Sequence, residues 1–203
     1  MALNKIGVFG GTFNPIHNGH LHLAKGYRNA LGLDRVLFVP TCIPPHKDAD
    51  DLLPASNRLD MCELATRDIS SMAVSDVEIR RGGKSYTVDT LRELAEMYPD
   101  DQLYFLMGAD MFLTIEEWNG FDEIARTAEL CTASRHEGEL PILKEHAHML
   151  EQKYGTHCHI KAIPVLDISS TQVRDALAGG DDIHELVPDA VQDYIYKNGL
   201  YRP

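Results

Sequence analysis

Short apolar runs that alternate with longer helix-like stretches are the feature that most restricts how this chain can fold. The runs are rich in β-branched and aromatic residues and cover residues 5–9, 35–39, 72–79, 102–107, 129–133 and 159–165. Between most of them, apolar residues recur at helical steps of three and four, as at Val88, Leu91, Leu94 and Tyr98. Because parallel strands need a crossover that is usually a helix, the alternation predicts an α/β fold with a mostly parallel sheet covered by helices on both faces.

The length of the chain favours a single domain. Its 203 residues can bury one sizeable core, and we expect that domain to span residues 1–203. Near the end, Pro188 and Gly199 bracket an apolar stretch, with proline early and glycine late as in a helix. With a helix expected after Ile168, this predicts a small C-terminal helical subregion at about residues 168–203. Residues 41–55 and 80–85, rich in proline and glycine, are expected to be irregular and are candidate substrate loops.

Charge and cysteine content narrow the classes of partner. The net charge is −12 and no dense run of Lys and Arg occurs, which disfavours a nucleic-acid partner but not a small anionic substrate. No segment approaches the roughly 20 apolar residues of a membrane span, and the apolar run near the N-terminus is too short for a signal-peptide core and leads directly into glycines. The cysteines are widely spaced, which is typical of reduced thiols and predicts a cytoplasmic protein; they are Cys42, Cys62, Cys131 and Cys158.

The most informative stretch covers residues 10–21, between the first expected strand and a helix expected to reach about Leu31. Ligands of open α/β sheets bind beyond the carboxyl ends of the strands, where this stretch lies. Its two leading glycines let the backbone approach a phosphate, and the helix that begins near Gly19 offers unpaired N–H groups to an anion. His17 and His20, three residues apart, can both donate hydrogen bonds to a phosphoryl oxygen. The stretch therefore predicts a phosphate site, although turn and surface roles are the plainer alternative.

A second stretch, residues 168–174, follows the last expected strand and opens a helix that runs toward Gly179. It reads Ile-Ser-Ser-Thr-Gln-Val-Arg, and because serine and threonine favour helix N-caps, ordinary capping with Arg174 at the surface is one interpretation. A helix start with hydroxyls and an arginine one turn later can also hold a pyrophosphate, because a guanidinium binds two oxygens at once. Because residues 10–21 also predict a phosphate site, the interpretation of residues 168–174 as a pyrophosphate site is the stronger one.

Together these residues carry a resemblance to a known family. Residues 10–21 resemble the Gly-Thr-Phe-x-Pro-x-His-x-Gly-His-Leu signature of the HxGH nucleotidyltransferases, and residues 168–174 resemble the Ile-Ser-Ser-Thr-x-x-Arg motif of the same superfamily. Pro-Pro-His-Lys at residues 44–47, Gly-Ala-Asp at residues 108–110 and the only tryptophan, Trp118, extend the match. The set is similar to the bacterial nicotinate-nucleotide adenylyltransferases over nearly the whole chain.

The resemblance implies a Rossmann-like, doubly wound sheet and transfer of the adenylyl group of ATP to nicotinate mononucleotide, which gives deamido-NAD and pyrophosphate. The catalytic residues that it implies are His17, His20 and Arg174. Its ATP-binding positions are Gly10, Gly11, Thr12, Phe13, Gly108, Asp110, Ser170 and Thr171. Its acceptor-binding positions are His46, Lys47, Thr87, Trp118 and Arg135. The chain reads Arg-His-Glu-Gly from Arg135, where the family often has Arg-Pro-Gly. A tryptophan can equally pack in a core, and a His-Lys pair can be a plain polar loop.

The expected reaction is a direct in-line attack. Nothing matches an activated covalent nucleophile, and a phosphate monoester is already an anion near neutral pH. The difficulty is to position two anions and to stabilise the charge that develops. We assign His17 and His20 to the α-phosphate, and Arg174 with the start of its helix to the leaving pyrophosphate. Mg²⁺ is expected to accompany ATP, without a dedicated metal motif.

Other interpretations stay open at this point. The nearest is another adenylyl- or cytidylyltransferase, with nicotinamide mononucleotide or phosphopantetheine as its acceptor. A nucleotide-sensing module would keep the fold, and a fragment of a class I aminoacyl-tRNA synthetase would share the histidine signature, although this chain is short and acidic for that role. The sequence leaves a homo-oligomer open. Five residues could ligate a transition metal but match no structural zinc spacing; they are His146, His148, His157, Cys158 and His159.

Overall fold

A computed structural model describes residues 3–44, 52–134, 137–164 and 166–201. Within these residues the centre is one sheet of six strands in the order β3-β2-β1-β4-β5-β6, and each neighbouring pair is parallel. The order reverses between β1 and β4, the point at which sheets of this kind bind ligands. The predicted α/β, doubly wound, Rossmann-like sheet is thereby confirmed. The strands are β1 (Lys5–Gly11), β2 (Arg35–Pro40), β3 (Met72–Val74), β4 (Gln102–Gly108), β5 (Glu129–Ser134) and β6 (Cys158–Ala162).

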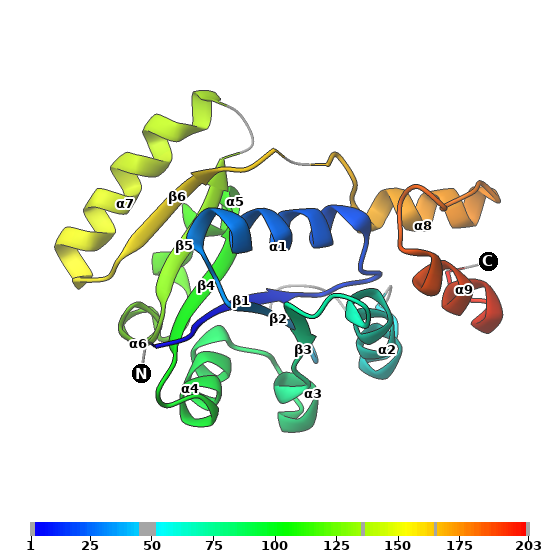
Figure 1. The fold of residues 1–203 in the computed structure, drawn as a ribbon, viewed down its shortest axis with the longest axis horizontal. Helices are drawn as coiled ribbons and strands as arrows, with labels where there is room; N and C mark the ends of the chain where they lie inside the picture. The colour runs from blue at the N-terminus through cyan, green and yellow to red at the C-terminus, as the bar shows by residue number, and fades with distance from the viewer. Residues whose placement is uncertain (1–2, 45–51, 135–136, 165, 202–203) are drawn as a thin grey trace.

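Helices cover both faces of the sheet (Figure 1). One buried core joins the sheet to α1 (Asn18–Leu31), α2 (Ala55–Thr66), α8 (Ser170–Gly179) and α9 (Asp189–Asn198). The other core joins it to α3 (Val77–Arg81), α4 (Thr87–Met97), α5 (Ala109–Phe112), α6 (Phe121–Thr127) and α7 (Leu140–Tyr154). Two 3-10 turns, η1 (Ile115–Glu117) and η2 (Glu137–Glu139), follow α5 and precede α7. In Figure 1, α7 lies at one end of the molecule and α8 with α9 at the other.

β1 shows how the strands divide their side chains between the two cores. Ile6 and Val8 are buried in the core shared with α4, whereas Phe9 belongs to the core shared with α1, because successive side chains of a strand point to opposite faces. β4 is buried along nearly its whole length, as central parallel strands are. Tyr27 of α1 holds that helix over the sheet, since its hydroxyl donates to the Met107 carbonyl at 2.8 Å.

The apolar run at residues 72–79, predicted as one strand, needs correction. It is a strand only over Met72–Val74 and then continues into α3. Short apolar runs are compatible with either structure, and here Val77 is buried as part of a helix. The same helix takes in Arg80 and Arg81, so the irregular segment predicted at residues 80–85 begins later than expected.

Other boundaries lie close to their predicted positions. α1 ends at Leu31, and α9 lies between Pro188 and Gly199, as the start and stop signals of helices predict. β6 is shorter than the predicted run at residues 159–165, and Val165 lies outside the described residues. Among the helices of the described ranges, none combines the length and the apolar character that a membrane crossing requires.

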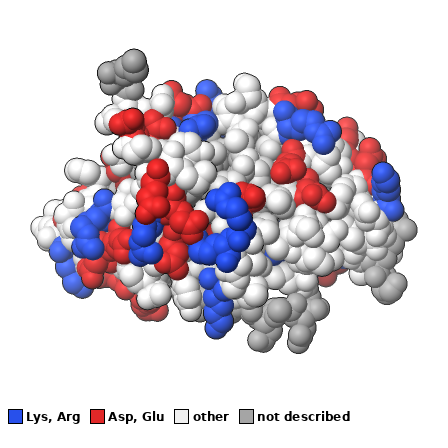
Figure 2. Space-filling model, turned by 90° about the horizontal axis from the view of Figure 1, so that it is seen from below, with Lys and Arg blue, Asp and Glu red and all other residues white. Residues whose placement is uncertain are grey.

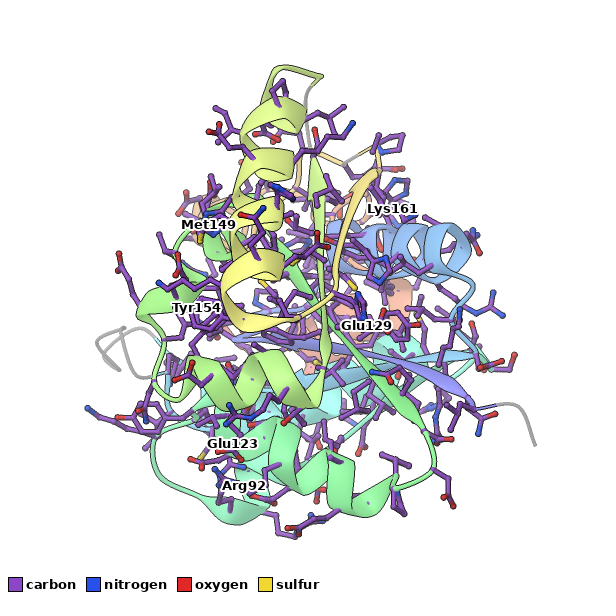
Figure 3. The ribbon with its side chains drawn as sticks, turned by 90° about the vertical axis from the view of Figure 1, so that its left-hand side faces the viewer. Arg92, Glu123, Glu129, Met149, Tyr154 and Lys161 are labelled. Carbon is purple, nitrogen blue, oxygen red and sulfur yellow. The ribbon has the colours of Figure 1, made fainter. Side chains whose placement is uncertain are left out.

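Exposed ion pairs lie outside the core that contains α4 and α6. On the face drawn in Figure 2, basic and acidic groups lie next to one another and form no broad basic area. One pair joins two helices: Arg92 of α4 donates from Nε and Nη2 to the two carboxylate oxygens of Glu123 of α6, at 2.7 and 2.8 Å. Figure 3 shows these two side chains next to each other. Exposed pairs of this kind contribute little to stability.

Candidate active site

Two histidines stack at the start of α1. The ring centroids of His17 and His20 lie 3.6 Å apart with 28° between the planes. The backbone N–H of His17 donates to Nδ1 of His20 at 3.2 Å, so a neutral His20 carries its proton on Nε2, which remains a donor. Burial lowers the pKa of His17 to about 4, and burial together with the neighbouring His17 lowers the pKa of His20 well below its usual value. Near neutral pH the pair therefore consists of uncharged donors.

Phe13 packs against His20. Its ring packs edge-on against the His20 ring at 5.0 Å and is 2% exposed, so its side chain belongs to the core. Its φ of 47° lies in the left-handed region, which bulky residues rarely adopt. A Cβ at Gly11 would come within 2.9 Å of this ring, whereas one at Gly10 would meet nothing within 4 Å. Gly11 is thus required by packing against Phe13, and Gly10 borders open space where a ligand can approach.

Gly19 lies where the two sequence motifs meet. A Cβ at this position would lie 3.0 Å from Nδ1 of His17 and 3.3 Å from the backbone oxygen of Ile168. Both distances are shorter than ordinary van der Waals contact. A glycine here lets the imidazole of the first motif and the backbone of the second approach one another.

Hydrogen bonds join the two motifs directly. The hydroxyl of Ser170 donates to the Pro15 carbonyl at 2.9 Å, and Nη1 of Arg174 donates to the Asn14 carbonyl, also at 2.9 Å. The bonded residues are 155 and 160 positions apart in the sequence. Arg174 also donates from Nη2 to the Thr171 hydroxyl at 3.3 Å. The start of α8 therefore packs against the loop that precedes α1, which brings the two motifs into direct contact.

The N-cap of α8 is Ser169 and not Ser170. The Ser169 hydroxyl accepts from the backbone N–H of Gln172 at 3.1 Å, while the Gln172 side chain returns a bond to the Ser169 backbone. The interpretation of this motif as ordinary capping thus holds for Ser169. It does not describe Ser170 and Arg174, whose side chains hold the loop before α1.

The predicted nucleotide positions on β4 lie at the same edge of the sheet. β4 is the neighbour of β1, and both strands end with a glycine at their carboxyl ends. Gly108 is the residue before α5, and Asp110 lies exposed in the first turn of that helix. Thr12 follows β1 directly. This edge is the switch point of the sheet, so these residues lie where the fold binds ligands.

The predicted acceptor residues are only partly described. Thr87 is the first residue of α4, and Trp118 directly follows η1, where its ring packs edge-on against Phe105 at 6.0 Å and stays half-buried. His46, Lys47 and Arg135 lie outside the described residues.

Arg58 is a residue of this region that the sequence reasoning did not single out. It lies on α2, is 0% exposed, and donates to three backbone carbonyls: Nη1 to Thr12 at 2.7 Å, Nη2 to Cys42 at 2.9 Å and Nε to Leu53 at 3.0 Å. One signal was present, since Arg58 falls on the buried stripe of α2, in helical steps from Met61, Cys62 and Ala65.

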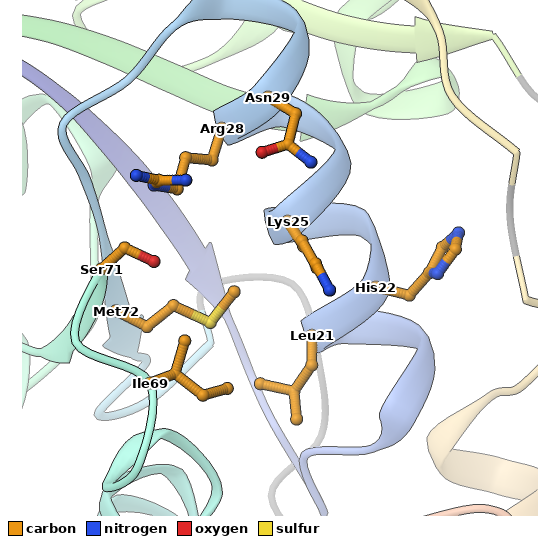
Figure 4. A pocket seen from close by; sticks show the side chains of 8 residues that line it. All are labelled: Leu21, His22, Lys25, Arg28, Asn29, Ile69, Ser71 and Met72. Carbon is orange, nitrogen blue, oxygen red and sulfur yellow. The ribbon is translucent and has the colours of Figure 1, made fainter.

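A pocket of about 260 Å³ lies between α1 and the connection from α2 to β3 (Figure 4). Leu21 and Met72 give it an apolar side, and Lys25 and Arg28 of α1 add two cations. None of the residues that line it belongs to the predicted site. The motif histidines, His17 and His20, are not among its lining residues.

The histidines near α7 do not gather around one point. His146 packs against Phe112, His148 hydrogen-bonds with Gln152, and His159 pairs with Glu129. In the part of the chain that the structure describes, no three His, Cys, Asp or Glu residues form a group suited to a metal ion.

Comparisons with known proteins identify the family of this chain. The model of the Cytidylyltransferase-like family matches residues 8–176, a range that contains both motifs, and so defines the class. A protein of Clostridium tetani named "probable nicotinate-nucleotide adenylyltransferase" is 36% identical, with 98% of this chain and 100% of the relative covered. One of Desulfitobacterium hafniense with the same name is 41% identical, with 98% and 96% covered. The chain therefore belongs to the nicotinate-nucleotide adenylyltransferase family.

Solved structures agree on the fold. The nicotinic acid mononucleotide adenylyltransferase of Plasmodium falciparum, complexed with NaAD, matches with a TM-score of 0.74 at 22% identity and covers 98% of this chain and 97% of its own. The same protein complexed with APC matches with a TM-score of 0.71 at 21% identity. At this identity the likeness concerns the arrangement of the sheet and its helices.

Proposed function

We propose that this protein transfers the adenylyl group of ATP to nicotinate mononucleotide and releases deamido-NAD and pyrophosphate, as an enzyme of NAD biosynthesis. Membership of the family supports the reaction. The observation that carries the proposal is the contact between the two motifs, in which Ser170 and Arg174 bond to the carbonyls of Pro15 and Asn14. This contact brings the start of α8 against the loop that carries the histidine pair, and helix starts of this kind can bind phosphate.

The chemistry is one in-line displacement. A phosphate oxygen of the acceptor forms a bond to the α-phosphorus, and the bond from that phosphorus to the bridging oxygen of the β-phosphate breaks, so that pyrophosphate leaves with the electron pair. Nε2–H of His20 donates to an α-phosphoryl oxygen, with His17 stacked beside it. Arg174 and the first N–H groups of α8 hold the leaving pyrophosphate. Preorganised donors of this kind act most strongly where charge develops in the transition state.

The remaining predicted residues divide between the two substrates. Thr12 and the backbone of Gly10, Gly11 and Phe13 border the triphosphate, with Ser170 and Thr171 on its other side. Gly108 and Asp110 border the nucleoside end. We assign Thr87 and Trp118 to the acceptor, and the family resemblance assigns His46, Lys47 and Arg135 to it as well. A tryptophan face suits the pyridinium ring of the acceptor, because aromatic rings attract cations.

Mg²⁺ enters this proposal as part of the substrate, MgATP. The donors at the histidine pair and at the start of α8 are neutral or cationic and suit phosphate oxygens, while Mg²⁺ prefers oxygen ligands, phosphates among them. We also propose that the enzyme acts in the cytoplasm on small molecules without a nucleic acid or membrane partner. Its four cysteines are unpaired, which supports a reducing compartment.

The test is turnover by the purified protein with MgATP and a panel of acceptors. Nicotinate mononucleotide is expected to give equimolar pyrophosphate and a product with the mass of deamido-NAD. Nicotinamide mononucleotide and phosphopantetheine serve as alternative acceptors, and CTP as an alternative donor. A higher kcat/KM for any of these alternatives would reassign the substrate, and the lack of pyrophosphate release with nicotinate mononucleotide would overturn the proposal.

A further inference from the structure

We infer that Arg58 is a positioning residue, which fixes the loop that binds ATP relative to the loop that binds the acceptor. The inference rests on the proposed function for the identity of the two substrates. In this assignment Arg58 contacts neither substrate, because its side chain is 0% exposed and its guanidinium donates to backbone carbonyls. Its effect on the reaction would pass through the backbone that it holds.

The guanidinium bridges three segments that are separate in sequence. Nη1 donates to the carbonyl of Thr12 in the loop after β1, and Nη2 donates to the carbonyl of Cys42 in the loop after β2. Nε donates to the carbonyl of Leu53, just before α2. The planar guanidinium presents its donors in a fixed fork, so these bonds set the relative positions of their acceptors.

The bridge continues to a third loop on the acceptor side. The backbone N–H of Cys42 donates to the hydroxyl of Ser85 at 3.0 Å, and the N–H of Ser85 donates back to the Ile43 carbonyl, also at 3.0 Å. Ser85 is buried and lies two positions before Thr87, a predicted acceptor residue. A path of hydrogen bonds therefore runs from Thr12 through Arg58 and Cys42 to the start of α4.

The burial of this charge is weak evidence that its bonds serve mainly stability. A charged group removed from water is costly, and well-packed apolar residues of similar volume often stabilise a protein as much or more. Burial accordingly lowers the pKa of the Arg58 guanidinium, which stays protonated at neutral pH. A methionine would fill the same space but could not tie two loops together.

In-line attack depends on how the two phosphates face each other. A misplacement of about 1 Å can cost roughly 10²-fold in rate. ATP bound alone needs only its own loop, whereas turnover needs both loops in register. Loss of the bridge should therefore lower kcat strongly and leave ATP binding nearly unchanged.

The experiment compares Arg58→Met and Arg58→Lys in the full chain, with kcat, the Kd for MgATP and Tm measured for each. We expect Arg58→Met to lower kcat by about 10- to 100-fold with the Kd for MgATP within about threefold of wild type. Arg58→Lys, which keeps a cation and part of the bonding, should recover part of the loss. Leu150→Ala is the matched control, because Leu150 is 0% exposed on α7 in the other core and should lower Tm without lowering kcat.

Ser85→Ala tests the same path of hydrogen bonds without removing a charge. It replaces Arg58→Met as the test if that variant does not fold. It should lower kcat less than Arg58→Met and again spare ATP binding. The inference would be overturned if kcat were unchanged in both Arg58→Lys and Ser85→Ala. It would also be overturned if kcat and the affinity for ATP fell in proportion to Tm. The wild-type rate with nicotinate mononucleotide tests the proposed function separately, and the variants can be compared with whichever phosphate acceptor the wild type uses.

Discussion

Arg58 and Arg92 carry the same guanidinium in opposite surroundings. Arg58 is fully buried and donates to backbone carbonyls of loops next to the site, whereas the Arg92 side chain is 48% exposed and donates to the carboxylates of Glu123 and Asp89. Exposed ion pairs are screened by water and salt and tolerate replacement. A buried cation bound to main-chain oxygens fixes the path of the chain. The difference shows where this molecule uses polar groups for geometry rather than for surface charge.

The same contrast applies to the regions around these residues. Beneath the site, His17, Asn14 and Arg58 are all buried although they are polar. In the layer of α4 and α6, buried contacts come mainly from apolar side chains such as Leu91 and Ile124. We therefore expect substitutions beneath the site to affect catalysis more than stability, and substitutions on the outside of α4 and α6 to affect neither strongly.

The largest effect should follow from His20→Ala, which removes a neutral donor from the α-phosphate. We expect kcat to fall by roughly 10²- to 10³-fold, as for other preorganised donors. His22→Ala is the matched control on the same helix, because the His22 ring bonds to the Pro164 carbonyl outside the motif. Steady-state kinetics with saturating MgATP decide the point, and a His20→Ala enzyme within a few-fold of wild type would remove His20 from the mechanism.

The buried histidines should also make stability depend on pH. Burial lowers the pKa of His17 from its usual value of 6.5 to about 4, so as the pH falls below 6.5 the unfolded chain gains a proton that the folded chain does not. The contribution of neutral His17 to the free energy of unfolding is therefore fully present above pH 6.5. It is lost progressively as the pH falls toward 4, by about 3 kcal/mol over the whole window. Urea unfolding of wild type and His17→Asn at steps of pH measures the difference. Parallel curves for the two proteins would contradict the buried, neutral assignment.

A smaller effect is expected from Gly19→Ala, which probes the close approach of the two motifs. The added Cβ would push against His17 and the Ile168 carbonyl, so we expect kcat to fall about tenfold through displacement of the histidine. Gly138→Ala is the control, because a Cβ at Gly138 meets nothing within 4 Å. Equal kcat values for the two variants would show that the surroundings of Gly19 can accommodate a Cβ without displacing His17.

The smallest effect should come from Arg92→Ala on the outer surface. We expect kcat/KM to stay within about twofold of wild type and Tm to fall slightly, with the difference shrinking as salt is added. Thermal scans at low and high ionic strength, together with one kinetic assay, measure both quantities. A loss of activity comparable to that of Arg58→Met would erase the contrast between the two arginines.

The sequence predicts those features that depend on local pattern. Alternating apolar runs and helical spacing predict the parallel sheet, and glycine and proline predict the limits of α1 and α9. Residues 72–79 could not be assigned correctly in this way, because a short apolar run is too short for its periodicity to distinguish a strand from a helix. The wrong boundary there reflects tertiary packing of Val77 rather than local preference.

The candidate site divides in the same way. The histidines and Arg174 stand in motifs, so their sequence positions identify them, although their assigned roles stay predictions. The bonds from Arg58 to Thr12 and Cys42 depend on how α2 packs against the loops after β1 and β2. No local sequence pattern predicts that packing. The reason for glycine at position 11 is similarly hidden, because it depends on where the Phe13 ring packs.

The long separation between the bonded motifs has a consequence for synthesis on the ribosome. The carbonyls of Pro15 and Asn14 emerge early, but their donors on Ser170 and Arg174 are translated 155 to 160 codons later. At about 5 to 20 residues per second, the early loop waits roughly ten to thirty seconds for these partners. A nascent chain stalled before Ser170 would already carry the histidine signature but would lack the two donors that bond to the loop before α1.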